Sequence, residues 1–516
     1  MAFTPKFPPI YQLNNDVLWH IFCFNTIPDH YFLNPDSYQA SEESSTLTAR
    51  WSSQVCQSWR SIILSSPKIW ANSINMRHFS QKDSYWRDEV LKRTGGCSLS
   101  IIGNEITTEH PAASFLFFLL ESHWICLRRI YLLIMDPSFS KDSRWKRLEI
   151  GESPTLEIFN MRFPRSFHAM QTTDNIFITP RLHTLIIHQF SFNLARPWNF
   201  NILNLKLIWI SIGEDVIYAL GQMSMLEHLS LEWCEIANLS AIKEVALSGK
   251  HNPTILPKLK FVYMQNDLDA ITSVMAYFAP TPGCNYWIEA FSSHNGIDPL
   301  SCDLLQQTFT SHFKNLRPIN DKIPEMSLAL SRNQIAISNF IRVHSNGLPN
   351  PLFTYKINLV RQSACDVKST LLKALTSCRL GSLSAIKLSF DGSRLNSSNS
   401  ELTMKSFLST LASIRTLHTD LSALDAISHA EERAADSLML PNLATVLMEY
   451  SPCVVPEMVH RFLSIRSLKS APIQTLDITN YDTFDTRFFE SLLHYPNLKV
   501  KKTRIPRLRG ALMHGS

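Results

Sequence analysis

One short pattern of apolar residues recurs along most of the chain and constrains its fold more than any other feature. Two variable residues separate its first two apolar positions, and one separates the second from the third. It occurs at Leu127-Ile130-Leu132, Leu156-Phe159-Met161, Leu182-Leu185-Ile187, Leu205-Ile208-Ile210, Leu226-Leu229-Leu231, Leu259-Val262-Met264, Leu383-Ile386-Leu388, Leu443-Val446-Met448 and Ile473-Leu476-Ile478. Successive starts among the first six lie 29, 26, 23, 21 and 33 residues apart. These intervals bracket the period of roughly 20–29 residues that is typical of leucine-rich repeats.

Each such segment is predicted to be a strand in which alternate side chains point into the core. A proline two residues before an apolar position, as at Pro180, Pro257 and Pro441, is tolerated because its missing N–H lies outside the strand ladder. Between the strands, residues 215–223 and 405–414 are predicted to be helices on the opposite side. One strand and one return cannot bury an apolar face alone, so neighbouring repeats must stack in sequence order. We therefore expect one curved solenoid with a single, mostly parallel sheet.

Residues 265–380 do not keep this register, and there we expect degenerate repeats or an insertion rather than a separate domain. The face between the inward positions would be the binding surface of a repeat body. Its candidate residues are His183, Thr184, Ile186, Glu227, His228, Ser230, Lys260, Tyr263 and Thr445.

Residues 8–75 differ from the rest of the chain, because two amphipathic helix patterns flank a polar insert. In the first pattern Asn14, Asn15 and Asp16 offer N-cap side chains, and Val17, Leu18, Ile21 and Phe22 follow at helical spacing. The second pattern comprises Val55, Trp59, Ile62 and Ile63, and ends before Pro67. Trp70, seven residues after Ile63, would fold back onto the same stripe.

The segments LNNDVLWHIF (13–22) and VCQSWRSIILSSPKIW (55–70) resemble the two ends of the F-box motif found in the expanded F-box families of fungi. The second segment is the more specific match, with Val-Cys-x-x-Trp-Arg followed by Ser-Pro-x-x-Trp. The first departs from the motif at Asn14, where proline is usual, and residues 25–47 form an insert.

This resemblance implies a three-helix hook that binds a Skp-type adaptor and, through it, a cullin. The residues for adaptor contact or for the hook's own core are Leu13, Val17, Leu18, Ile21, Phe22, Val55, Cys56, Trp59, Ile62, Ile63 and Trp70. About fifty residues cannot bury a self-sufficient core, so a partner surface suits the sequence. The alternative is a helical hairpin packed on its own C-terminal body, in which this stripe is ordinary core.

Residues 83–96 are predicted to be a further helix, with Trp86, Val90 and Leu91 on one side and Gly95 and Gly96 as a left-handed stop. It would couple the hook rigidly to the body. The expected fold is α/β: an F-box domain at 8–75, with its insert at about 25–47, a linker helix at 76–96, and a repeat-like substrate-binding domain at 97–516.

Composition and motifs bear on what the chain can do. Its net charge of +5 reflects a terminal cluster of Lys499, Lys501, Lys502, Arg504, Arg507 and Arg509, so no nucleic-acid footprint is expected. The 10 cysteines form no C-x-x-C pair, and no nucleotide-binding or metalloprotease motif occurs. We therefore expect free thiols, no cofactor, no metal and no catalytic residue.

The N-terminus shows no secretory signal, and the apolar run at 112–120 is far shorter than the roughly 20 residues that span a membrane. We expect a soluble cytoplasmic or nuclear protein with no membrane partner. The resemblance predicts the substrate-recognition subunit of a Skp–cullin–F-box ubiquitin ligase, which binds an unknown protein substrate. The alternatives are an interaction scaffold acting outside a cullin ligase, and an enzyme without a recognisable motif.

Overall fold

The structure is a computed structural model. It describes residues 13–501 except 27–44, 80–82, 108–110, 135, 141, 143, 145–151, 164–178, 190–200, 249–252, 280, 282, 293–298, 316–324, 332, 341–352, 360–363, 379, 381–382, 391–397, 434–437, 450–455 and 480–485. The chain divides into two compact units, Met1–Ala237 and Asn238–Ser516, which we call unit 1 and unit 2. Each is described by itself below.

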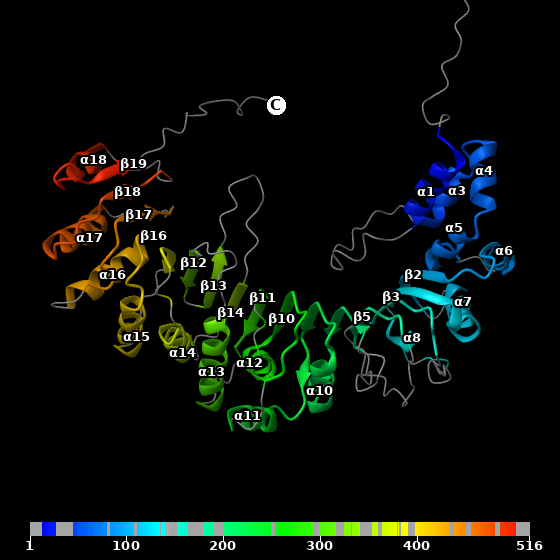
Figure 1. The fold of residues 1–516 in the computed structure, drawn as a ribbon, viewed down its shortest axis with the longest axis horizontal. Helices are drawn as coiled ribbons and strands as arrows, with labels where there is room; N and C mark the ends of the chain where they lie inside the picture. Colours follow the sequence, from blue (N-terminus) through cyan, green and yellow to red (C-terminus); the bar gives the residue numbers. More distant parts are fainter. Residues whose placement is uncertain are drawn as a thin grey trace, which may run out of the picture. The chain divides into compact units, whose positions relative to one another are not determined.

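Unit 1 is built on a parallel sheet (Figure 1). Its strands pair in sequence order and are β1 (Ile74–Asn75), β2 (Leu99–Ile106), β3 (Leu127–Ile134), β4 (Ile158–Arg162), β5 (Thr184–His188), β6 (Asn204–Ile208) and β8 (His228–Glu232). A second small parallel pair joins β7 (Ser211–Ile212) to β9 (Glu235–Ile236). The described helices are α1 (Asn15–Thr26), α3 (Ser45–Ser52), α4 (Gln57–Leu64), α5 (Pro67–Asn72), α6 (Tyr85–Arg93), α7 (Pro111–Ser122), α8 (Pro137–Ser140) and α10 (Glu214–Gln222), with short 3₁₀ turns η2 (Met76–His78) and η3 (Trp124–Cys126).

Unit 2 contains a mostly parallel sheet with one reversal. Along the sheet its strands are β10 (Phe261–Asp267), β11 (Asn285–Phe291), β14 (Phe353–Asn358), β13 (Gln334–Phe340), β12 (Glu325–Leu330), β15 (Ala385–Phe390), β16 (Thr416–Thr419), β17 (Thr445–Met448), β18 (Thr475–Asp477) and β19 (Lys499–Lys501). Strand β13 is antiparallel to both of its neighbours. Every other pair in the unit is parallel.

The expectation that neighbours stack in sequence order is wrong at this reversal. Strand β11 pairs with β14, and β12 pairs with β15, so three consecutive strands enter the sheet in reverse order. The reversal falls within residues 265–380, where the apolar register is lost. An antiparallel neighbour needs no long crossover, and therefore the inserted strands extend the sheet without a repeat period.

Helices cover one face of the unit 2 sheet (Figure 1). They are α11 (Leu239–Leu247), α12 (Leu268–Tyr277), α13 (Pro299–Asn315), α14 (Ala364–Thr376), α15 (Ser398–Ser409), α16 (Leu421–Arg433), α17 (Pro456–Leu468) and α18 (Thr486–Leu492). Strand burial alternates accordingly: Val262 and Met264 of β10 are buried, whereas Tyr263 and Gln265 between them are partly exposed on the other face.

All nine apolar segments lie on strands, which confirms the strand prediction. Their middle positions align across the sheet of unit 1 as Ile130, Phe159, Leu185, Leu205 and Leu229. The predicted register was wrong for β6. Leu205 aligns with the middle position of the neighbouring segments rather than with their first position. The apolar segment on β6 is therefore Ile202-Leu205-Leu207, and all three side chains are buried. Apolar residues are so frequent here that the segment beginning at Leu205 fitted the pattern as well as the one beginning at Ile202.

The helix predictions differ in accuracy. Residues 215–223 correspond to α10, which begins at Glu214 and ends at Gln222. The prediction at 405–414 was too late, because α15 begins at Ser398 and ends at Ser409. Leu411 and Ile414 instead form the buried approach to β16. An i, i+3 apolar spacing occurs in both a helix and this turn, so periodicity alone did not separate them.

The core of unit 2 contains a buried histidine on α13. His312 is 3% exposed, and its ring lies 5.2 Å from that of Tyr286 in an edge-on contact. Burial lowers the pKa of His312 from its ordinary 6.5 to about 4, although a polar contact with the backbone of Met275 opposes this. The side chain is therefore neutral in the folded protein at pH 7.

The stability of unit 2 should consequently fall in mild acid. Well above pH 6.5 His312 is neutral in both the folded and the unfolded chain. Between pH 6.5 and about 4 the histidine is protonated in the unfolded chain but stays neutral in the folded protein, so the free energy of unfolding falls. Well below pH 4 both states are protonated and this loss of stability is complete. The full loss corresponds to about 3 kcal/mol in the free energy of unfolding. The free energy of unfolding, measured with urea at several pH values in this range, should fall less steeply with decreasing pH for His312→Phe than for the wild type. Equal pH dependence in the two proteins would contradict this account.

Candidate functional site

The first helix of the chain has one buried and one exposed apolar side. Asn14 caps it, because its Oδ1 accepts a hydrogen bond of 2.8 Å from the backbone N–H of Val17, as predicted. Leu18, Phe22 and Cys23 are buried. Burial raises the pKa of the Cys23 thiol, although nearby Lys68 opposes this, so the thiol stays protonated near neutral pH.

The buried side of α1 packs against α4 and α5. The ring of Phe22 meets that of Trp59 at 4.9 Å in an edge-on contact. Trp70 does fold back: its indole N–H donates a hydrogen bond of 2.9 Å to the carbonyl of Ile63, and both side chains are buried. Cys56 caps α4, because its Sγ accepts from the backbone N–H of Trp59 at 3.5 Å. These contacts make a small internal core.

Six large apolar side chains of the same block remain exposed, with exposed fractions between 38% and 71%. We call them the apolar stripe: Leu13, Val17, Ile21, Phe24, Trp51 and Val55. Val17, Ile21 and Phe24 follow helical spacing along α1, Leu13 lies two residues before that helix, and Trp51 belongs to α3. Several exposed large apolar side chains on one small block are typical of an interaction surface, because covering them removes apolar area from water.

The predicted adaptor-contact residues therefore separate into three groups. Leu13, Val17, Ile21 and Val55 are exposed; Leu18, Phe22, Ile63 and Trp70 are buried; and Cys56, Trp59 and Ile62 are half-buried. The first group belongs to the surface and the second to the core.

Four features of this block were missed or misplaced in the predictions from sequence. Val55 was predicted on the helical stripe, but α4 begins at Gln57 after the extended Cys56, so Val55 lies in the preceding turn. The expected insert at 25–47 is shorter, because α1 continues to Thr26 and α3 begins at Ser45; its remaining residues lie outside those described. Trp51 was missed because α3 has little apolar periodicity. Phe24, however, follows Ile21 at helical spacing and was detectable.

The helical block is continuous with the sheet of unit 1. After α5, β1 pairs with β2 through Ile74 and Ile101, and the hydroxyl of Thr46 on α3 donates to the carbonyl of Ser73. Helix α6 confirms the helix predicted within 83–96, and Gly95 and Gly96 have φ angles of 57° and 78°.

Helix α6 packs directly on Trp70. The guanidinium of Arg93 lies 4.9 Å from the Trp70 ring, and Trp86 meets the same ring edge-on at 6.2 Å. A Cβ at Gly95 would lie 3.2 Å from Pro67, so the two segments are in close contact. The coupling between block and sheet is built from packed side chains.

The helix-free face of unit 2 carries an aromatic cluster on β10 and β11. Tyr263 and Trp287 are neighbours in register, and Trp287 is 41% exposed. The indole N–H of Trp287 donates to Glu289 at 3.3 Å, and Gln265 donates to the same carboxylate at 3.4 Å while accepting from Tyr263 at 3.1 Å. Tyr263 belongs to the face predicted to bind a partner.

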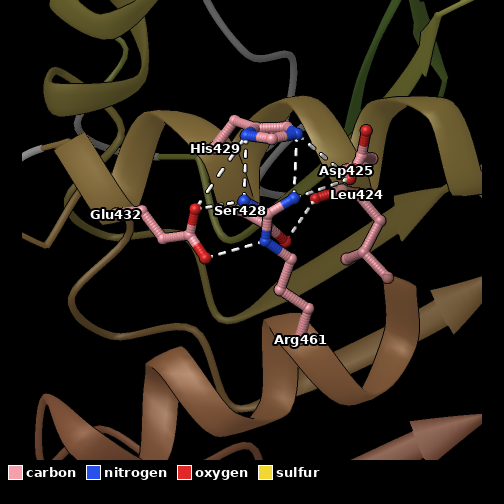
Figure 2. Close-up of polar contacts among 6 residues, drawn as sticks. All are labelled: Leu424, Asp425, Ser428, His429, Glu432 and Arg461. Atoms are coloured by element: carbon pink, nitrogen blue, oxygen red, sulfur yellow. Dashed lines mark hydrogen bonds and ion pairs between the residues drawn. The ribbon is translucent and has the colours of Figure 1, made fainter. Parts of the chain in front are cut away.

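On the helical side of unit 2, polar residues link neighbouring helices. Figure 2 shows Arg461 of α17 between the ring of His429 and the carboxylate of Glu432, both on α16. Hydrogen bonding to Arg461 lowers the pKa of Glu432, so this carboxylate is ionised. The group is an exposed ion-pair network between adjacent helices.

A histidine of α17 and a serine of α18 lie in direct contact. Nε2 of His460 lies 2.7 Å from Oγ of Ser491, but this hydroxyl donates to the carbonyl of Phe488 at 2.6 Å. A serine activated by a base directs its proton to the base instead. Burial lowers the pKa of His460, whose ring also stacks on Tyr495. The arrangement suits helix packing.

No family model matches the chain, and no curated protein is significantly similar in sequence. Among the described residues, no three histidine, cysteine or acidic side chains are grouped to hold a metal ion, and the described cysteines with resolved surroundings are free thiols. None of the described helices is both long and apolar enough to cross a bilayer.

Proposed function

We propose that the chain is the substrate-recognition subunit of a Skp–cullin–F-box ubiquitin ligase. The N-terminal helical block would bind a Skp-type adaptor, and the helix-free sheet faces would bind a protein substrate. Such a subunit acts by proximity, because other subunits supply the chemistry.

The exposed apolar stripe is the observation that supports this function most. The block satisfies its own core with Phe22, Trp59, Ile63 and Trp70, so exposure of Val17 and Ile21 does not follow from an unfilled interior. The segments with the F-box resemblance are the ones that form this block. The alternative hairpin, in which the stripe packs on the chain's own body, leaves Val17 and Ile21 unexplained within unit 1.

The substrate half of the proposal is supported by the aromatic cluster on β10 and β11. An exposed tryptophan held by a carboxylate is pre-organised, so little side-chain freedom is lost on binding. Tryptophan and tyrosine also dominate the energetics of protein interfaces. Trp287 and Tyr263 are therefore the residues on this face most suited to substrate contact.

The proposal is tested by assembling the full chain with a purified Skp-type adaptor and the N-terminal part of a cullin. Size-exclusion chromatography should show all three proteins in one peak. A complex with adaptor that excludes the cullin would favour a scaffold outside a cullin ligase. The absence of any complex with the adaptor would refute the assignment.

A further inference from the structure

Two tryptophans at adjacent strand ends of unit 1 have an unusual backbone. Trp209 follows β6 and Trp233 follows β8, with φ angles of 56° and 55°. Their rings are stacked, with centroids 5.6 Å apart and planes 13° from parallel. Both side chains are half-buried, so part of the stack is open to solvent.

The left-handed backbone is unfavourable for a residue with a bulky side chain. The turn itself does not require tryptophan, because this chain uses asparagine at two other left-handed positions, Asn238 and Asn497. A sequence selected only for the turn would favour glycine or asparagine at both sites. The strain therefore indicates that the two indole rings contribute something that the smaller residues lack.

A third left-handed residue, Gln189, continues the row at the end of β5. The backbone N–H of Gln189 donates to the carbonyl of Ile208 at 2.9 Å. In the same way, the backbone N–H of Trp209 donates to the backbone carbonyl of Glu232 at 2.9 Å. Gln189 is 6% exposed, and its Oε1 accepts no hydrogen bond from any described residue.

The sequence around the stack is rich in acidic residues. Residues 208–242 contain five acidic residues and no lysine or arginine, although the chain has a net charge of +5. Glu232 is already paired with Lys206 at 2.7 Å, whereas Glu214, Asp215 and Glu235 are exposed and form no ion pair with any described residue. Glu235 lies two residues after Trp233 and pairs in register with Ser211, which lies two residues after Trp209.

We propose that Trp209 and Trp233, with Glu235, bind an arginine or lysine side chain presented by a segment of a partner protein. Indole faces attract cations, and a neighbouring carboxylate adds direct charge complementarity. The same acidity disfavours nucleic acid, whose phosphates would be repelled. Within the proposed function this partner would be the substrate. Only the identification of the partner as a substrate rests on the proposed function.

The binding test uses the full chain and a fluorescent peptide with two arginines, compared with the same peptide containing citrulline, which keeps the shape without the charge. We expect saturable binding of the arginine peptide that weakens as salt is raised, and at least tenfold weaker binding of the citrulline peptide. Equal affinity for the two peptides, stronger binding of the citrulline or an acidic peptide, or no saturable binding would overturn the proposal.

Three variants locate the site. Trp233→Asn, which suits the left-handed turn, should weaken binding of the arginine peptide at least tenfold, and Glu235→Gln should weaken it several-fold. Tyr218→Ala, an exposed aromatic on α10 in the same acidic stretch, should leave it unchanged. If Trp233→Asn does not fold, Glu235→Gln decides by itself: unchanged binding of the arginine peptide by this variant overturns the proposal. Adaptor binding is measured separately, so its failure would refute the ligase assignment without affecting the peptide result.

Discussion

Val17→Asp combined with Ile21→Asp should abolish binding of the Skp-type adaptor, weakening it at least a hundredfold. Both side chains are about 40% exposed on one side of α1 and belong to the apolar stripe. Burying two unpaired carboxylates against an apolar partner costs several kcal/mol, and each 1.4 kcal/mol changes the affinity about tenfold. Isothermal titration or a pull-down with purified adaptor measures the effect.

The matched control is Tyr85→Asp. Tyr85 is 73% exposed at the start of α6 and lies outside the stripe, so the same charge there should leave adaptor binding unchanged. Circular dichroism should show both variants folded, because none of the three side chains is buried. Wild-type affinity in the double variant would place the adaptor elsewhere on the chain.

Truncation inside the block should behave differently. Trp59→Ala removes the ring that contacts Phe22, so it should loosen the helices as well as reduce binding. Val55→Ala should affect binding alone, because Val55 is 57% exposed. A combined Val55→Ala and Trp59→Ala variant therefore mixes two causes, and the exposed aspartate pair is the cleaner test.

Arg466→Met should destabilise unit 2 by roughly 3–5 kcal/mol, because it leaves a buried carboxylate without its partner. Arg466 and Glu431 have no exposed side-chain area, and their Nη1 and Oε1 atoms are 3.0 Å apart. Arg466 also donates to the carbonyls of Leu440 at 3.0 Å and Ala471 at 3.3 Å. With the carbonyl of Leu443, which accepts from Arg466 at 3.5 Å, four groups would lose a charged donor at once.

Arg461→Met provides the comparison, because Arg461 joins the same two helices through an exposed network (Figure 2). Exposed ion pairs contribute about 1 kcal/mol or less, so this variant should unfold in urea almost like the wild type. Amide hydrogen exchange in α16 and α17 would localise the difference. Equal stability of the two variants would contradict the account of the buried pair. Replacing Glu431 with methionine as well should recover part of the loss.

Local pattern in the sequence predicted part of the sheet, but it missed the strands β11 to β14 and β16. A strand that is buried on one face leaves a period-two trace of apolar residues, and all nine such segments lie on strands. Caps and stops were equally local: Asn14 bonds the first turn of α1, and the paired glycines end α6. These features depend on residues within a few positions of one another, so one sequence suffices to predict them.

The tertiary structure alone decided which strands are neighbours and which apolar residues are covered. Val17 and Leu18 are adjacent in sequence and similar in chemistry, yet Leu18 is buried and Val17 is exposed. The reversed entry of β12, β13 and β14 and the complete burial of Arg466 likewise depend on contacts between distant segments. Periodicity reports the side of an element on which apolar groups lie. It contains no information about what, if anything, packs against that side, and for this chain that distinction separates core from binding surface.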